Sequence, residues 1–328
     1  MNNEEDLFMA VISAVNRTIV LLSAMLTIVV AWGFFRIPDA NILILTFTFL
    51  TAAFVVDIPS FRGRLEMAVR LACFGSTAQF FVAILFDHPL LQVVVSTIFS
   101  GIVFRSLPDI RSSCIVLIVG YLAFSAPPGF QPAAGRVIDI FCGVPVIMTV
   151  TSLCRLDDTR AEIKYIPCSR RRSLILAAEL GAGNLICQMF HIRQGAWIML
   201  TILFITMAET PANSGRELAI QRIFAVPAGI ITGGLLLDVF CRTDHRLVYL
   251  IPLTGAAGFF FLYKYGNFFV FSLIFMITLT IFSDWMTGPY HRFHFLDILF
   301  SRSAASLLGA VLAIIFSIAE FSAGREKV

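Results

Sequence analysis

The sequence predicts an all-α membrane protein of about twelve transmembrane helices, arranged as two parallel six-helix repeats. Composition is the first reason: apolar residues make up 58% of the chain, charged residues make up 14%, and mean hydropathy is +0.88, outside the range of soluble proteins. The second reason is a series of hydrophobic runs along the whole chain. The third is a pattern, Pro-x-x-x-Gly-Arg-x-x-x-x-x-Arg, that occurs twice and ends at Arg70 and Arg222.

The hydrophobic runs define the expected helices in order. The first set lies at 18–35, 40–56, 65–86, 90–104, 112–125 and 137–154, and the second at 173–190, 196–208, 218–237, 247–263, 268–282 and 295–320. A helix needs about 20 residues to cross a hydrocarbon core of about 30 Å. The runs at 90–104, 112–125 and 196–208 are shorter, so we expect thin spans or partly re-entrant helices there, which leaves the exact helix count open.

The two sets of runs match each other in sequence. At an offset of 155 residues, Thr46 pairs with Thr201 and Thr51 with Thr206, and after a short slip both copies of the arginine pattern align at an offset of 152. An ordered set of identities is hard to obtain by chance, even in apolar sequence. Because each set holds an even number of runs, both halves are expected to insert in the same direction, around a pseudo-twofold axis along the membrane normal.

We therefore predict a first membrane repeat at 1–154, a short basic linker at 155–172 and a second repeat at 173–328. Lys and Arg residues are concentrated at the run ends that share a side with the N-terminus, which places both termini and the linker in the cytoplasm. The N-terminus, Met1–Asp6, is acidic, unlike the basic start of a cleaved signal peptide, so the first run is expected to remain.

The two repeated arginines are the strongest candidates for a functional site. Arg70 and Arg222 each lie about 9 Å past the cytoplasmic start of a helix, where charge is costly. Snorkelling to the headgroups is the alternative, but it does not require the same residue at the same depth twice. We expect both guanidinium groups to face the pseudo-twofold axis and to bind a carboxylate bidentately. Arg64 and Arg216 are expected to add positive potential at the mouth or to act as ordinary cytoplasmic anchors.

Two carboxylates accompany these arginines. Glu66 lies four residues before Arg70 on the same expected helix, at pairing distance. Glu179 is expected at the depth of Arg222, and its protonation would release that arginine for substrate and couple transport to protons. A permanent structural ion pair between Glu179 and Arg222 is the alternative.

Other polar residues in the runs are secondary candidates. Asp139 and Asp297 open the sixth run of each half and either cap a helix or border the pathway. Arg302 lies deeper and has no match in the first half. Thr46 and Thr201 either line a polar path or form hydrogen bonds between helices.

Catalytic and metal-binding patterns are not recognisable, so we expect neither an enzyme nor a cofactor. His291 and His294 have a spacing that could hold a metal, but no third ligand clusters with them, and they lie among interface residues, so no metal site is predicted. The seven cysteines are expected to be free and buried. A net charge of only +3 gives no reason to expect nucleic acid as a partner.

The stretch Gly195–Thr201 precedes a helix that contains Gln221-Arg222-Ile223 and is followed by the small residues Gly229 and Gly233-Gly234. With these stretches the chain resembles the fusaric acid resistance and aromatic acid exporter family over most of its length, and the second half fits the pattern well. The first half departs from the pattern at Asn41-Ile42 and Phe74-Gly75-Ser76. Large members insert a cytoplasmic domain between the halves, which this chain lacks, so it resembles the compact branch, whose members have no defined substrate.

The resemblance implies a multi-pass protein of the bacterial inner membrane that exports organic, often aromatic, carboxylates together with a periplasmic adaptor of the membrane-fusion type. The same clan includes plant malate channels whose six-span subunits dimerise around an arginine-lined path, so a homo-oligomer is a further possibility. Three hypotheses remain: a secondary exporter of organic anions driven by the proton gradient, a passive anion channel, and a non-transporting scaffold subunit. We favour the exporter.

Overall fold

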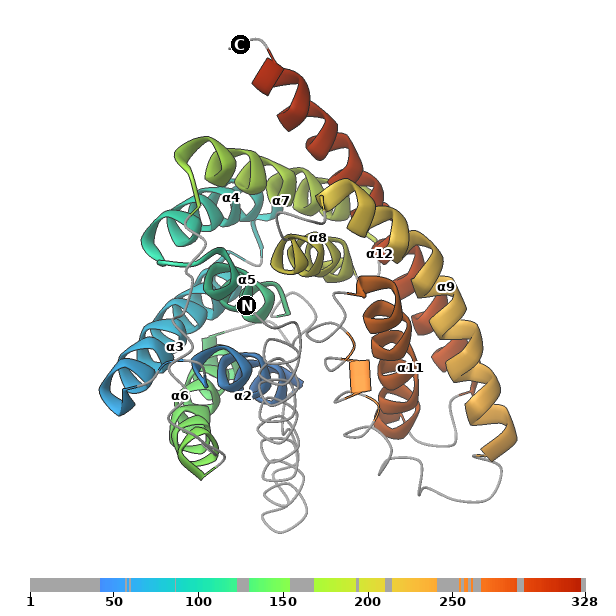
Figure 1. The fold of residues 1–328 in the computed structure, drawn as a ribbon, viewed down its shortest axis with the longest axis horizontal. Helices are drawn as coiled ribbons and strands as arrows, with labels where there is room; N and C mark the ends of the chain where they lie inside the picture. The colour runs from blue at the N-terminus through green and yellow to red at the C-terminus, as the bar shows by residue number, and fades with distance from the viewer. Residues whose placement is uncertain are drawn as a thin grey trace, which may run out of the picture.

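The described part of the chain is helical (Figure 1). The computed structural model describes residues 42–56, 58, 60–85, 87–122, 130–153, 168–192, 195–209, 214–240, 254, 257–258, 261, 267–287 and 292–325. Its helices are α2 (Ile42–Val55), α3 (Phe61–Ile84), α4 (Pro89–Ser106), α5 (Ile110–Leu122), α6 (Phe130–Leu153), α7 (Arg170–Phe190), α8 (Ala196–Ala208), α9 (Gly215–Phe240), α11 (Phe268–Thr287) and α12 (Arg292–Arg325). The predicted run at 18–35 and most of the run at 247–263 lie outside the described residues.

Each described helix contains most of its predicted run, and capping explains the earlier starts of α3 and α7. The run at 196–208 coincides with α8. In α3, the Ser60 hydroxyl accepts a hydrogen bond from the Gly63 amide at 3.0 Å, so the helix begins before its hydrophobic run. In α7, Ser169 caps the Arg172 amide at 3.2 Å, and the helix begins inside the predicted linker.

Five described helices are long and apolar enough to cross a membrane, which supports a multi-pass membrane protein. They are α4, α6, α7, α9 and α12, with apolar spans at Pro89–Ser106, Ala133–Leu153, Arg170–Phe190, Gly215–Leu236 and Phe300–Glu320. Of the three short runs, 90–104 is thus extended into an 18-residue candidate span. The other two form 13-residue helices, α5 and α8.

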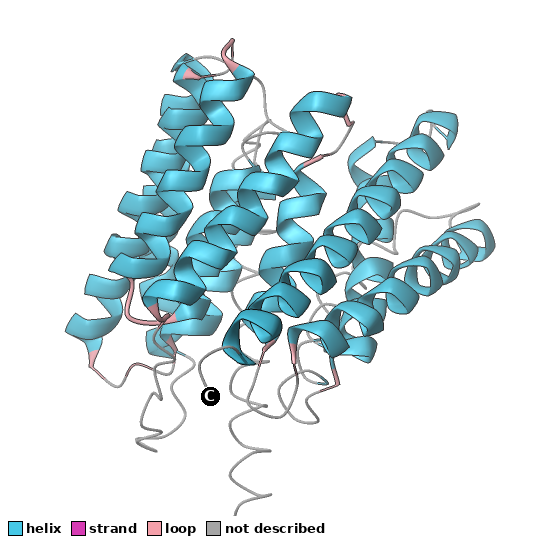
Figure 2. Cartoon of the chain, turned by 90° about the horizontal axis from the view of Figure 1, so that it is seen from above, coloured by secondary structure: helices cyan, strands magenta, loops and turns pink. Residues whose placement is uncertain are grey.

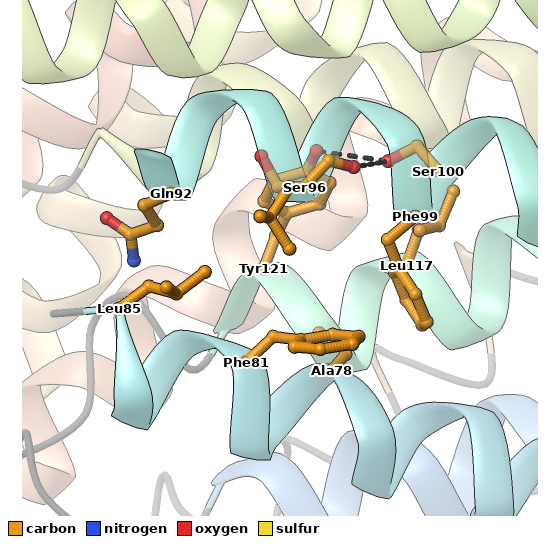
Figure 3. A pocket seen from close by; sticks show the side chains of 11 residues that line it. Ala78, Phe81, Leu85, Gln92, Ser96, Phe99, Ser100, Leu117 and Tyr121 are labelled. Atoms are coloured by element: carbon orange, nitrogen blue, oxygen red, sulfur yellow. Dashed lines mark hydrogen bonds between the residues drawn. The ribbon is translucent and has the colours of Figure 1, made fainter. Parts of the chain in front are cut away.

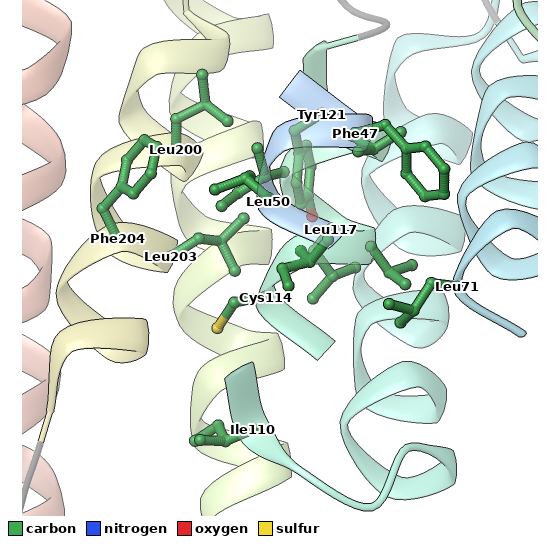
Figure 4. Close-up of a cluster of buried hydrophobic side chains, with 14 of the residues drawn as sticks. Phe47, Leu50, Leu71, Ile110, Cys114, Leu117, Tyr121, Leu200, Leu203 and Phe204 are labelled. Atoms are coloured by element: carbon green, nitrogen blue, oxygen red, sulfur yellow. The ribbon is translucent and has the colours of Figure 1, made fainter. Parts of the chain in front are cut away.

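The short helices α2, α5 and α8 form the interior, and the longer ones surround them (Figure 1). Seen from above, the described residues form helices and loops without strands (Figure 2). Nearly every residue of α5 and α8 is buried, as expected for helices that are apolar on all sides. Leu50 of α2, Leu117 of α5 and Leu203 of α8 belong to one buried cluster (Figure 4). Because lipid is as apolar as these side chains, close packing holds the helices together more than exclusion of water does.

Helices at matching positions of the two predicted repeats make similar packing contacts. α3 packs on α6 as α9 does on α12, α2 on α6 as α8 does on α12, and α3 on α5 as α9 does on α11. Contacts between the two predicted repeats occur where α4 packs on α7 and where α5 packs on α8.

Candidate functional site

Arg222 is the largest fully buried side chain in the described residues, only 1% exposed. Its helix, α9, packs against α8, α11 and α12. Nη1 donates a long hydrogen bond of 3.5 Å to the Ser272 hydroxyl on α11, and the guanidinium lies 5.4 Å from the centre of the Phe204 ring on α8. Nε and Nη2 have no hydrogen-bond partner among the described residues.

These neighbours stabilise the positive charge but leave Nε and Nη2 without a hydrogen-bond acceptor among the described residues. A guanidinium over an aromatic face gains about 0.5–2 kcal/mol, far less than the several kcal/mol that removing an ion from water costs. Nε and Nη2 lie on one edge of the planar group and form the fork that matches the two oxygens of a carboxylate. Arg222 is therefore placed to bind an anion.

Arg70 does not lie on a buried face, and this corrects the expectation of two equivalent inward arginines. Its side chain is 45% exposed and donates to Glu66 Oε1 at 2.8 Å, which confirms the predicted pairing of Glu66 with Arg70. Arg70 and Arg222 occupy the same position in the repeated pattern. The buried face of α9 contains Arg222, whereas the buried face of α3 contains Leu71, one residue after Arg70. One residue turns a helix by about 100°, so equal sequence positions point in different directions.

The two arginines at the helix starts also differ. Arg64 is buried, and its Nη1 donates to the Ile58 carbonyl at 3.1 Å, which ties the preceding segment to the start of α3. Arg216 is exposed at the start of α9. Of these two residues, Arg64 has a structural contact, and Arg216 is the one whose exposed side chain an anion can reach.

Glu179 does not pair with Arg222 in this structure. It is buried on α7, its Oε1 has no hydrogen-bond partner among the described residues, and the charged groups that act on it are Arg172 and Glu320. Arg172 itself forms an ion pair with Glu209. The predicted counter-ion contact fails because α7 packs on α4, α8 and α12, whereas the contacts of Arg222 come from α8 and α11.

The remaining predicted residues are placed in part. Thr201 is buried on α8, and its hydroxyl has no hydrogen-bond partner in the described part of the chain. Arg302, partly buried on α12, lies 5.5 Å from the Trp197 ring. Asp139 is half-buried in α6, and the side chains of Thr46 and Asp297 lie outside the described residues.

Sequence reasoning missed a polar seam between α4 and α7. Gln188 Nε2 donates to Gln92 Oε1 at 3.0 Å, and Asn184 Nδ2 donates to the Ser96 hydroxyl at 2.9 Å. Polar residues spaced by four on both helices were the available signal, since they share one helix face. This seam joins the two predicted halves.

A small cavity of about 30 Å³ lies beside this seam, between α3, α4 and α5 (Figure 3). Gln92, Ser96, Ser100 and Tyr121 supply its polar wall, and the Ser100 and Tyr121 hydroxyls are 3.2 Å apart. Its volume suits about two water molecules and is too small for an organic anion. The cavity is lined by helices of the first half only, so Arg222 is the better candidate site.

The described residues hold no group of three His, Cys, Asp or Glu side chains that could bind a metal. His291 and the side chain of His294 lie outside them.

Comparison with known proteins supports the resemblance found in the sequence. Residues 180–316 match the family model described as fusaric acid resistance protein-like. The matched stretch contains α8, α9 and α11 and most of α12, and therefore Arg222 with Ser272 and Phe204. No curated protein and no solved structure matched the chain.

Proposed function

We propose that this chain, whose residues 180–316 match a fusaric acid resistance family of membrane transport proteins, is a secondary exporter of organic carboxylates in the bacterial inner membrane. One observation carries the proposal: a fully buried arginine has two side-chain nitrogens, Nε and Nη2, without a hydrogen-bond partner among the described residues. A buried charged group in that state costs several kcal/mol, so a functional role is its best explanation.

In the proposed mechanism, Nε and Nη2 of Arg222 bind the two oxygens of the substrate carboxylate. Ser272 and Phe204 hold the guanidinium in place before and after binding. Because Arg222 is enclosed, substrate enters and leaves only when α9 moves relative to α8 and α11. Pro227, inside α9 five residues after Arg222, removes one backbone hydrogen bond and provides the hinge.

We further propose twelve spans in two parallel repeats, with both termini cytoplasmic. The equivalent packing of α3 with α6 and of α9 with α12 supports the repeat. In this orientation Arg222 lies seven residues, about 10 Å, from the cytoplasmic start of α9. Arg216, exposed at that start, attracts anions toward the site.

Energy coupling is proposed to use Glu179 through a different contact from the one expected. Glu179 lies two turns after Arg172 on α7, so its carboxylate is stabilised as an anion when Arg172 is free and as a neutral acid when Arg172 pairs with Glu209. Protonation of Glu179 would thus follow the movement of α7 relative to the end of α8. A periplasmic membrane-fusion adaptor completes the export path in this proposal.

The test is efflux of radiolabelled benzoate from energised and de-energised cells, comparing wild type with Arg222→Gln. Arg70→Gln is the matched control, since it makes the same change at the motif-equivalent position but on an exposed face. We expect energy-dependent efflux that Arg222→Gln abolishes and Arg70→Gln preserves, at equal membrane insertion. Equal efflux in wild type and Arg222→Gln would reject the arginine site and favour the scaffold hypothesis. Flux that requires Arg222, does not depend on the proton gradient and carries an electric current would favour the channel.

A further inference from the structure

The face of α8 that meets Arg222 carries a second cation–aromatic contact. Trp197, Thr201 and Phe204 are spaced by four and three residues, so they lie along one face of the helix. Arg222 lies over Phe204 at 5.4 Å, and Arg302 lies over Trp197 at 5.5 Å. Each end of this face therefore holds one arginine against one ring, although the two arginines come from different helices.

Helix α12 runs close against the same face. A Cβ added to Gly309 would lie 2.5 Å from the Ile198 carbonyl oxygen and 3.0 Å from Thr201 Cβ, so only glycine allows this approach. Arg302, Ser306 and Gly309 repeat the spacing of four and three residues on α12. Ser306 thus lies on the same face of α12, between Arg302, which contacts Trp197, and Gly309, which contacts Ile198 and Thr201.

The two hydroxyls in the middle of this interface are unusual. Thr201 and Ser306 are both buried, at 0% and 1% exposure, and neither hydroxyl has a hydrogen-bond partner among the described residues. Serine and threonine in membrane helices normally bond to a backbone carbonyl one turn earlier, as Thr206 does to Ile202 on this same helix. Both hydroxyls are therefore available to a ligand that passes between the two arginines.

We infer that Arg302 and Trp197 form a second anion subsite, which receives the carboxylate from Arg222 along this face of α8. The inference rests on the proposed function of Arg222. Seven residues separate Phe204 from Trp197, about 10 Å along the helix. Because α12 packs closely on Thr201 in this structure, Thr201 and Ser306 donate hydrogen bonds to the passing carboxylate only when α12 moves away from α8. In the cytoplasmic-termini orientation, Arg222 is the inner subsite and Arg302 the outer one.

Trp197 makes the outer subsite observable. The chain has three tryptophans, so Trp32→Phe with Trp285→Phe leaves Trp197 as the single fluorophore. The purified variant in lipid nanodiscs is titrated with benzoate, and both Trp197 emission and bound radiolabelled benzoate are measured. We expect a saturable change of Trp197 emission. Arg302→Gln should remove that change and slow efflux about tenfold, while benzoate binding at Arg222 persists.

The outcomes separate the two proposals. Loss of benzoate binding in Arg222→Gln, together with unchanged emission and efflux in Arg302→Gln, would overturn the outer subsite and keep the inner one. Unchanged binding in Arg222→Gln would overturn the proposed function itself. Absence of any saturable emission change in the parent variant would also reject the subsite. Arg302→Lys keeps the charge without the planar fork and guards against misfolding; an intermediate efflux rate supports recognition by Arg302, and a wild-type rate contradicts it.

Discussion

Replacing Arg222 with methionine should stabilise the protein while abolishing transport. Methionine has an unbranched, flexible side chain that fills the space between Phe204 and Ser272 without a charge. The substitution removes a long hydrogen bond, worth about 0.5 kcal/mol, and a cation–aromatic contact, worth about 0.5–2 kcal/mol. It also removes two buried nitrogens that have no hydrogen-bond partner among the described residues, each of which costs about 1–3 kcal/mol.

The balance lies between about −0.5 and about 5 kcal/mol, with a midpoint of about 2 kcal/mol in favour of the variant, and it overlaps the range measured when other buried charges are replaced by apolar residues. The assay is thermal unfolding in nanodiscs, measured as the fraction of protein that remains monodisperse after heating to each temperature. Arg70→Met is the matched control, because an exposed ion pair such as Arg70–Glu66 contributes about 0–1 kcal/mol. A lower melting temperature for Arg222→Met than for wild type would refute the reasoning, since it would show that the arginine stabilises the fold.

Three further predictions concern packing and the cytoplasmic end. Ser96→Cys with Asn184→Cys should be cross-linked by a short bifunctional thiol reagent, because the Asn184 amide nitrogen lies 2.9 Å from the Ser96 hydroxyl; absence of the resulting mobility shift on denaturing gels would contradict the α4–α7 seam. Gly309→Ala should lower stability by about 1–3 kcal/mol, since its Cβ meets the Ile198 carbonyl oxygen, whereas Gly135→Ala, with nothing within 4 Å, should not; equal melting temperatures would argue against the close approach of α12 to α8. Burial raises the pKa of the Cys168 thiol despite the opposing charge of Arg172. Maleimide labelling of a Cys168-only variant should therefore be slow at neutral pH and should accelerate only when the pH exceeds the pKa of a free thiol; a labelling rate with the pH profile of free cysteine would contradict this.

The helices were predictable because their signal is local. A run of apolar residues ending at a Ser, Gly or Pro marks a helix in any membrane protein, and α8 follows its run residue for residue. Capping explains the extra turns at the starts of α3 and α7, where Ser60 and Ser169 precede charged residues that still fit a helix. The sequence therefore supports the segment order along most of the described chain.

The rotation of each helix about its own axis, which decides the residues that face inward, was not predictable from the repeated pattern. Both copies of the arginine pattern have the same spacing, yet Arg222 is buried and Arg70 pairs with Glu66 on the outside. Which residue turns inward depends on the packing of α3 on α5 and α6, and of α9 on α11 and α12, which is set by residues far away in sequence. Rotation about the helix axis is thus the information that the alignment of the two halves lacks.

The chemistry around Arg222 explains why an aromatic neighbour suits an anion site better than an acidic one. A carboxylate partner would form charge-assisted hydrogen bonds with the same fork that the substrate needs, so substrate would have to displace it. Phe204 instead contacts the face of the guanidinium, and its own ring packs on Phe275 at 5.2 Å, which holds it in place. The face of the cation is then covered while its Nε–Nη2 edge stays available. Arg172, by contrast, forms an ion pair with Glu209, so we assign it a structural or coupling role rather than a role in binding substrate.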